Sequence, residues 1–341
     1  MGLPEFWFIL IAVLFTGYFV LEGFDFGVGM LMGLMGRGDD DKRRAILNTI
    51  GPVWDGNEVW LLTAGGAMFA AFGGWYATMF TAFYLPLLLI LVALIVRVCA
   101  IEWRGKINDP QWRRVWDWCI AIGSWVPALL WGVAFANVVR GLPIDEKAQF
   151  TGTFFGLLNP YALLGGLTTV LAFLAHGAVF LSLKTAGELR EEATVWAARL
   201  SVAMTVVAAA FLLWTQFAHG KTWTWVPVLI AAVAAVATIF LTRARKEGLA
   251  FAATSVAIIM TVVTLFGCLY PNVLPSTTDP ANSLTIANTS SSHYTLVIMT
   301  WAALFITPIV LLYQGWSYWV FRKRISAEAI PPSVGLPSLR G

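Results

Sequence analysis

The 341-residue sequence has few charged residues, few histidines and few cysteines. Asp, Glu, Lys and Arg make up 12% of the chain, about half of the roughly 25% that is typical of soluble domains. This scarcity excludes an ordinary soluble protein, and the net charge of +3 gives no reason to expect a nucleic acid partner. The three cysteines, Cys99, Cys119 and Cys268, form no CxxC pair. We therefore expect neither a disulfide framework nor a metal site.

Apolar residues, by contrast, make up 59% of the chain. They form recurring runs of roughly 20 residues, long enough to cross a hydrocarbon core about 30 Å thick. The pattern predicts an all-α, polytopic membrane protein: one integral membrane domain (1–341), with no segment left over for a soluble domain. Nine transmembrane helices are expected, at Phe6–Met35, Ile50–Phe72, Tyr76–Ile101, Val115–Val138, Tyr161–Leu183, Trp196–Phe217, Thr224–Leu241, Ala250–Leu269 and Thr295–Phe321, followed by a cytoplasmic tail at 322–341.

Basic residues orient these helices. Most of the 22 Lys and Arg fall in alternate loops and the tail, within 37–44, 104–114, 184–199, 243–246 and 322–340. The intervening loops hold only Arg140, Lys147 and Lys221. The positive-inside rule then places the N-terminus outside and the C-terminus in the cytoplasm. We expect no cleavable signal peptide, because the first five residues carry no basic group and the first apolar run is too long.

Four carboxylates interrupt the first two predicted helices: Glu22, Asp25, Asp55 and Glu58. A carboxylate near the middle of a membrane helix costs roughly 2.5–3.5 kcal/mol on insertion scales, so such residues are usually functional. The cluster indicates a protein that moves protons or ions, or that binds a polar group within the membrane. The alternative is that the acids are hydrogen-bonded and serve only helix packing.

Two further ionisable residues, Arg97 and Asp117, are expected at the same depth. All six side chains should converge in the cytoplasmic half of the first four helices, where Arg97 can neutralise about one carboxylate. Pro52 removes a helix hydrogen bond just before Asp55. His176 lies alone in the fifth predicted helix, and we interpret it as a hydrogen-bonded packing residue rather than a haem ligand.

Several motifs, in the same order along nearly the whole chain, closely resemble subunit II of the cytochrome bd-type quinol oxidases. They are Glu22-Gly-Phe-Asp-Phe-Gly-Val-Gly29, Trp54-Asp-Gly-Asn-Glu-Val-Trp-Leu61, Thr63-Ala-Gly-Gly66, Trp112-Arg-Arg-Val-Trp-Asp-Trp118, Leu158-Asn-Pro160, Pro275-Ser-Thr277, Met299-Thr-Trp301 and Leu311-Leu-Tyr-Gln-Gly-Trp316.

The resemblance implies a haem-free, nine-helix subunit of the bacterial cytoplasmic membrane. Helices one to four (about 6–138) and five to eight (about 161–269) would form two bundles, with the ninth (about 295–321) at the periphery. A subunit I carrying haems b and d would oxidise quinol and reduce dioxygen to water. This chain would hold no catalytic residue or metal. Small single-helix accessory subunits and membrane lipid are the other partners implied.

The resemblance also implies roles for particular residues. Asp55 matches a carboxylate on a proton route from the cytoplasm, and the neighbouring acids Glu58, Asp25 and Glu22 are candidates for the same path. At the position of Glu58 some family members carry Gln. A bound quinone is implied near Asp25, Trp54, Arg97 and Asp117.

Two other functions remain open from the sequence. In an ion-coupled secondary transporter, the broken second helix and the acids would form a central binding site. That reading is weakened because the acids occupy one half of the chain, with no mirrored second motif. In a purely structural partner subunit, the acids would only hold the helices together.

Overall fold

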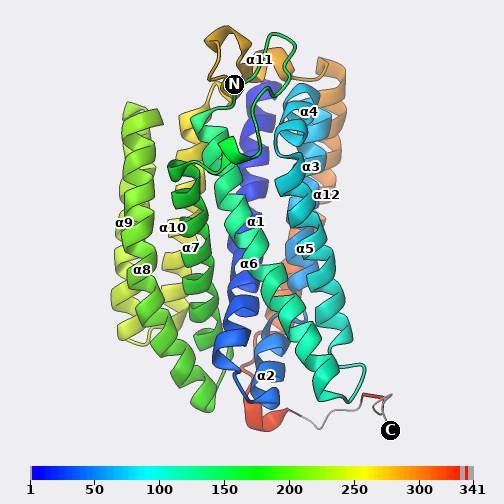
Figure 1. Cartoon of the computed structure of the whole chain (residues 1–341), viewed down its shortest axis with the longest axis vertical. Helices are drawn as coiled ribbons and strands as arrows, with labels where there is room; N and C mark the ends of the chain where they lie inside the picture. Colours follow the sequence, from blue (N-terminus) through cyan, green and yellow to red (C-terminus); the bar gives the residue numbers. More distant parts are fainter. Residues whose placement is uncertain (1, 331–334, 337–341) are drawn as a thin grey trace.

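The structure is a computed structural model that describes residues 2–330 and 335–336. In the described part of the chain, helices carry almost all of the fold (Figure 1). The α-helices are α1 (Leu3–Met35), α2 (Asp40–Ile50), α3 (Trp54–Ala71), α4 (Gly73–Ala82), α5 (Tyr84–Trp103), α6 (Pro110–Arg140), α7 (Pro160–Lys184), α8 (Gly187–His219), α9 (Trp225–Arg243), α10 (Glu247–Leu269), α11 (Ile286–Thr289) and α12 (His293–Val320). Short 3-10 helices lie at η1 (Phe155–Leu157), η2 (Thr222–Thr224), η3 (Pro280–Asn282) and η4 (Ala327–Ala329), and β1 (Asn272–Leu274) pairs antiparallel with β2 (Leu284–Thr285).

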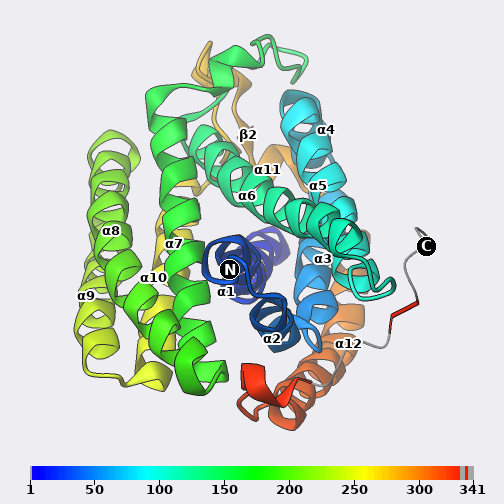
Figure 2. The same cartoon turned by 60° about the horizontal axis from the view of Figure 1, so that its bottom comes forward.

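Helix α1 is the centre of the molecule. It packs against α3, α6, α7 and α10, and Figure 2 shows it surrounded by the other helices. One group of helices, α3 to α6, lies on one side of α1, and α7 to α10 lie on the other. Helix α12 lies beside α3 at the periphery, and only 6% of its most apolar stretch is buried. Such a helix requires lipid or another protein chain around it.

Eight helices of the described residues are long and apolar enough to cross a membrane. Helix α3 is not among them, because its first turns carry Asp55, Asn57 and Glu58. The third predicted span is also interrupted, since the chain leaves helical geometry at Phe83 between α4 and α5. Nine spans therefore stay a prediction, in which α3 is the second span and α4 with α5 the third.

Helix α2 is absent from the predicted elements. Its N-cap, Asp39, accepts a hydrogen bond from the backbone N–H of Lys42 at 2.9 Å, which satisfies one of the free donors of the first turn. Ala45, Ile46 and Ile50 on one face are buried, while the other face is charged. The helix is too short and too charged to resemble a membrane span. The sequence pattern therefore predicts a basic loop at these residues.

The basic segments gather at one end of the bundle and are joined there by ion pairs. Arg190 and Arg324 both pair with Glu247, at 2.5 and 3.3 Å, and Lys42 pairs with Glu192. Helix α2 lies at this end, and the start of α1 lies at the opposite end with α11 (Figure 1). The loops that the charge pattern assigns to one side of the membrane therefore lie together in space.

Helices α1 and α7 cross at two glycines. A Cβ atom added to Gly27 would lie 2.0 Å from the Phe173 carbonyl oxygen and 2.8 Å from the Cα atom of Gly177. Any side chain at either position would therefore push the backbones apart. This contact joins the two groups of helices.

Candidate functional site at the contact of α1, α3 and α12

The centre of the site is an ion pair between Glu22 on α1 and Arg97 on α5. The Arg97 Nη1 atom donates to Glu22 Oε1, and both side chains are fully buried. The guanidinium carbon also lies 4.8 Å from the centre of the Phe26 ring, a cation–π distance. Arg97 therefore neutralises one carboxylate, as the charge pattern predicts.

A hydrogen-bonded chain runs from Asp25 to α12 through Asn57. Asn57 donates from Nδ2 to Asp25 Oδ2 at 2.7 Å and accepts at Oδ1 from the Tyr318 hydroxyl, also at 2.7 Å. Gln314 donates to the Gly56 carbonyl at 3.2 Å and accepts from the Trp60 indole N–H at 2.9 Å. This network links the buried acid of α1 to the broken start of α3 and to the peripheral helix.

Sequence reasoning misses the linking roles of Asn57, Gln314 and Tyr318. From the sequence, Asn57 is expected only to weaken the second predicted helix, together with Gly56. Gln314 lies in one of the motifs that carry the family resemblance, and a polar amide within an apolar helix is the signal that points to it. The Tyr318 hydroxyl gives no comparable signal in the sequence, because tyrosine is common at membrane interfaces.

Four buried polar atoms of the ionic site have no hydrogen-bond partner among the described residues. They are Glu22 Oε2, Asp25 Oδ1, and Nε and Nη2 of Arg97. Leaving a buried polar group unpaired costs roughly 1–3 kcal/mol. The unpaired Arg97 groups can only donate to another polar group, whereas the carboxylates can hold or exchange a proton.

Asp55 does not join this buried site, contrary to the expected convergence. Asp55 is exposed, and its carboxylate accepts the neighbouring Gly56 N–H at 2.8 Å. Glu58, half-buried one turn further along α3, lies close enough to Glu22, Asp25 and Arg97 for their charges to interact. Each helical residue turns by about 100°, so Asn57 points inward while Asp55, two residues earlier, points away. Trp54 beside them is half-buried.

Asp117 also lies apart from Arg97. Its carboxylate accepts from Arg43 Nη1 at 2.7 Å and from Arg104 Nε at 2.5 Å. Arg104 then pairs with Asp40 at 2.6 Å, as does Arg113. Arg104, which the sequence places in a solvated loop, is only 3% exposed. Burial acts to raise the pKa of Asp40, but the hydrogen bond from Arg104 and the charges of Arg104 and Arg113 lower it below its usual value.

Of the four residues implied as a quinone site, Asp25 and Arg97 lie together in the buried ionic site. Asp117 belongs instead to the ion pairs of α2 and α6. Of these four residues, only Asp117 lines either of the two cavities described here.

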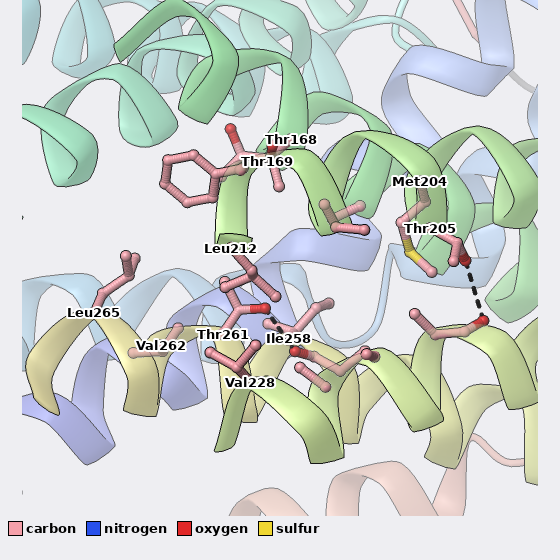
Figure 3. Close-up of a pocket in the computed structure, with 18 of the residues that line it drawn as sticks. Thr168, Thr169, Met204, Thr205, Leu212, Val228, Ile258, Thr261, Val262 and Leu265 are labelled. Carbon is pink, nitrogen blue, oxygen red and sulfur yellow. Dashed lines mark hydrogen bonds between the residues drawn. The ribbon is translucent and has the colours of Figure 1, made fainter. Parts of the chain in front are cut away.

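The first cavity lies between α7, α8, α9 and α10 and measures about 240 Å³ (Figure 3). Its lining is apolar apart from a few threonines, whose hydroxyls donate to backbone carbonyls. Thr169 donates to Ala128 at 2.6 Å, Thr205 to Ser201 at 2.7 Å, and Thr261 to Ala257 at 2.8 Å. The cavity therefore offers little to the carbonyl oxygens of a quinone ring.

His176 makes the hydrogen bonds expected of a packing residue. Its Nε2 atom lies 3.0 Å from the Val20 carbonyl oxygen, and Nδ1 lies 2.7 Å from the Thr254 hydroxyl. A carbonyl oxygen can only accept, so Nε2 carries the hydrogen. Both ring nitrogens are thereby engaged within the bundle.

The fold and the site together define a multi-pass membrane subunit with an ionic centre inside its helix bundle. Residues 3–321 match the sequence profile of the cytochrome bd terminal oxidase subunit II family, and the chain belongs to that family. It is 42% identical to cytochrome bd ubiquinol oxidase subunit 2 of Bacillus subtilis (strain 168) over 331 residues, which cover 95% of this chain and 97% of the relative.

Other relatives give the same result. Cytochrome bd-I ubiquinol oxidase subunit 2 of Escherichia coli (strain K12) is 37% identical over 365 residues, with 95% of each chain covered. A chain of the bd oxidase from Geobacillus thermodenitrificans has a similar fold, with a TM-score of 0.73 over 94% of this chain and 97% of that chain, at 18% identity. The protein is thus a subunit of a bacterial membrane oxidoreductase complex, and the secondary-transporter alternative is not favoured.

Proposed function

We propose that the chain is the haem-free subunit II of a quinol:dioxygen oxidoreductase and that it pairs with a subunit I carrying haems b and d. Family membership across residues 3–321 carries this proposal. Quinol oxidation and oxygen reduction then occur on the partner. This chain stabilises that partner and supplies protons from the cytoplasm. We further propose nine spans, with the N-terminus outside and the basic end in the cytoplasm.

The surface formed by α3 and α12 is the proposed contact with subunit I. Asp55 is exposed on α3, where hydrocarbon would leave its carboxylate unsolvated. Gly65 and Gly66, on the same helix, have open space where a Cβ atom would lie, which lets a neighbouring helix approach closely. The apolar side chains of α12 are almost all exposed. A partner helix bundle would cover all three features.

We propose that protons enter at Asp55. Helix α3 begins at the basic end of the bundle, directly after α2, and Asp55 is its second residue. Glu58 follows one turn deeper, and neither carboxylate makes an ion pair with a described residue. Protons passing from Asp55 to Glu58 would move along the proposed contact toward the partner. Asp25 and Glu22 lie behind this path, with Asn57 as the connection.

Purification tests the assignment. A tag on this chain should bring down a second membrane subunit, and the complex should show a chlorin-type haem band in its reduced-minus-oxidised spectrum. The isolated chain, expressed without the partner, should show no haem band. A purified, active complex without any haem would contradict the proposal.

A further inference from the structure

A second cavity, of about 710 Å³, opens at the basic end between α1, α2 and α6. None of its lining residues comes from α3, α5 or α12, so it lies outside the proposed contact with subunit I. Arginines and aspartates of the α1–α2 loop, α2 and the start of α6 line its charged part. Side chains of α1 and α6, among them Met30, Leu34 and Trp125, line its apolar part.

Two of the four arginines that line this cavity form no ion pair within the part of the chain that the structure describes. Arg43 and Arg113 face the cavity but are bound to Asp117 and Asp40. Arg37 and Arg114, which are exposed, form no ion pair with any residue that the structure describes. Asp39 is engaged as the cap of α2. The cavity therefore presents two available guanidinium groups, and these bind phosphate oxygens well.

The apolar part of the cavity begins next to these two cations. Leu34 on α1 is 46% exposed, and Trp118 and Trp125 on α6 are 65% and 39% exposed. Trp118 and Trp125 lie seven residues, or about two helical turns, apart and so point to the same side of α6. Gly33 on α1 has open space beside it, which keeps the floor of the cavity free. A tryptophan-lined wall beneath cationic groups matches the boundary between lipid headgroups and chains.

We propose that this cavity binds one anionic phospholipid, with its phosphate between Arg37 and Arg114 and an acyl chain along Leu34, Trp118 and Trp125. Basic pockets between membrane helices on the cytoplasmic side are known to hold such headgroups. The lipid would join α1 to α6 at the point where the neighbouring ion pairs already hold α2. Free phosphate would use the arginines but not the apolar wall, and a zwitterionic lipid would gain less from two unpaired cations.

The test measures lipid binding to the assembled, delipidated complex. Phosphatidylglycerol, phosphatidylcholine and inorganic phosphate are each titrated, and the rise in unfolding temperature is recorded together with the lipid retained in native mass spectra. The wild-type complex should be stabilised by phosphatidylglycerol only. The double variant Arg37→Gln/Arg114→Gln should bind it about 30-fold more weakly, since each basic residue contributes about 1 kcal/mol to holding an anionic lipid.

The matched control is Arg199→Gln/Arg243→Gln, which removes the same charge from two exposed arginines at the same end and should bind like the wild type. Gly33→Phe keeps both cations and fills the floor of the cavity, so it should lose phosphatidylglycerol binding as well. If the double variant fails to assemble, Gly33→Phe tests the same site. Equal losses in the control, stabilisation by inorganic phosphate, or retention of a quinone at this site would overturn the proposal.

Discussion

At the scale of single residues, the decisive feature is the ion pair between Glu22 and Arg97. Both charges are withdrawn from solvent, and only one hydrogen bond joins them directly. A buried pair of this kind adds little stability by itself, but removal of one partner leaves an uncompensated charge. The pair therefore constrains which substitutions the centre of the bundle tolerates.

Arg97→Met should destabilise the assembled complex by about 3–5 kcal/mol, because Glu22 then remains buried without its partner. The double variant Glu22→Leu/Arg97→Met should recover much of that loss, since both charges are removed. Arg199→Met, at an exposed position, should have little effect. Unfolding temperatures of the purified complexes measure all three. Equal losses in the single and double variants would show that Arg97 acts by shape alone.

The lowered pKa of Asp40 should make the stability of the protein depend on pH. Its folded-state pKa lies below the usual value, so its contribution is present above about pH 4 and is lost as the pH falls through the folded value. Asp40→Asn should therefore lower the unfolding temperature at pH 7, and the difference from wild type should shrink below about pH 4. Asp41→Asn, whose side chain is 68% exposed, is the control and should show a smaller difference at pH 7. A difference for Asp40→Asn that stays constant down to pH 3 would contradict this account.

The buried site could be predicted only in part from the sequence. Glu22 and Asp25 can be predicted because they are carboxylates inside apolar runs. Arg97 is the one basic residue expected at their depth, so the sequence also predicts that it pairs with a carboxylate. The helical turn of about 100° per residue separates Asn57 from Asp55, but a break at Pro52 hides which of them faces inward. The sequence places Arg104 in a solvated loop, because nothing in its neighbouring residues distinguishes a buried arginine from a loop arginine.

At the scale of helices, the crossing of α1 and α7 holds the two halves together. Gly27 and Gly177 bring the backbones into contact, and the Phe173 ring lies where a side chain at Gly23 would be. The sequence shows only a faint similarity between the segments around Gly23 and Gly177. The contact itself depends on three-dimensional packing, so the residue pattern alone cannot predict it. Helix α2 is not predicted for a different reason: five charged residues at its start precede its short buried face.

Gly27→Leu should prevent or severely weaken assembly, because its side chain would overlap the backbone of α7. Gly248→Leu is the matched control, since no atom lies within 4 Å of the added Cβ position. The amount of complex recovered from membranes, by its haem absorbance, measures the difference. Normal recovery of the Gly27→Leu complex would show that α1 and α7 do not cross as described.

At the scale of the whole molecule, the clustering of basic segments at one end sets the direction of the proposed proton path. The proposed nine spans and outside N-terminus would place α2 and Asp55 on the cytoplasmic side, with β1 and β2 outside. The apolar and charge patterns are sufficient to predict this arrangement. They say nothing about which helix faces are covered by other chains, because the partner is a separate sequence.

Cysteine labelling tests the orientation. In a background where Cys99, Cys119 and Cys268 are serine, a cysteine at Gly38 should react only from the cytoplasm. A cysteine at Asp279 should react only from outside, with permeabilised membranes as the control for accessibility. The reverse pattern would place Asp55 at the outer surface and remove it from a cytoplasmic proton path.

The most direct test of the proposed mechanism is the turnover of the Asp55→Asn complex. Asn keeps the shape of the side chain but has no ionisable carboxyl group with which to exchange a proton. With its haems fully loaded, the variant should still accept electrons from quinol, while oxygen consumption falls by on the order of 100-fold. Asp55→Glu should retain part of the activity, and Asp41→Asn should leave it unchanged. Normal turnover in a fully haem-loaded Asp55→Asn complex would contradict the proton route and leave this subunit as a structural partner.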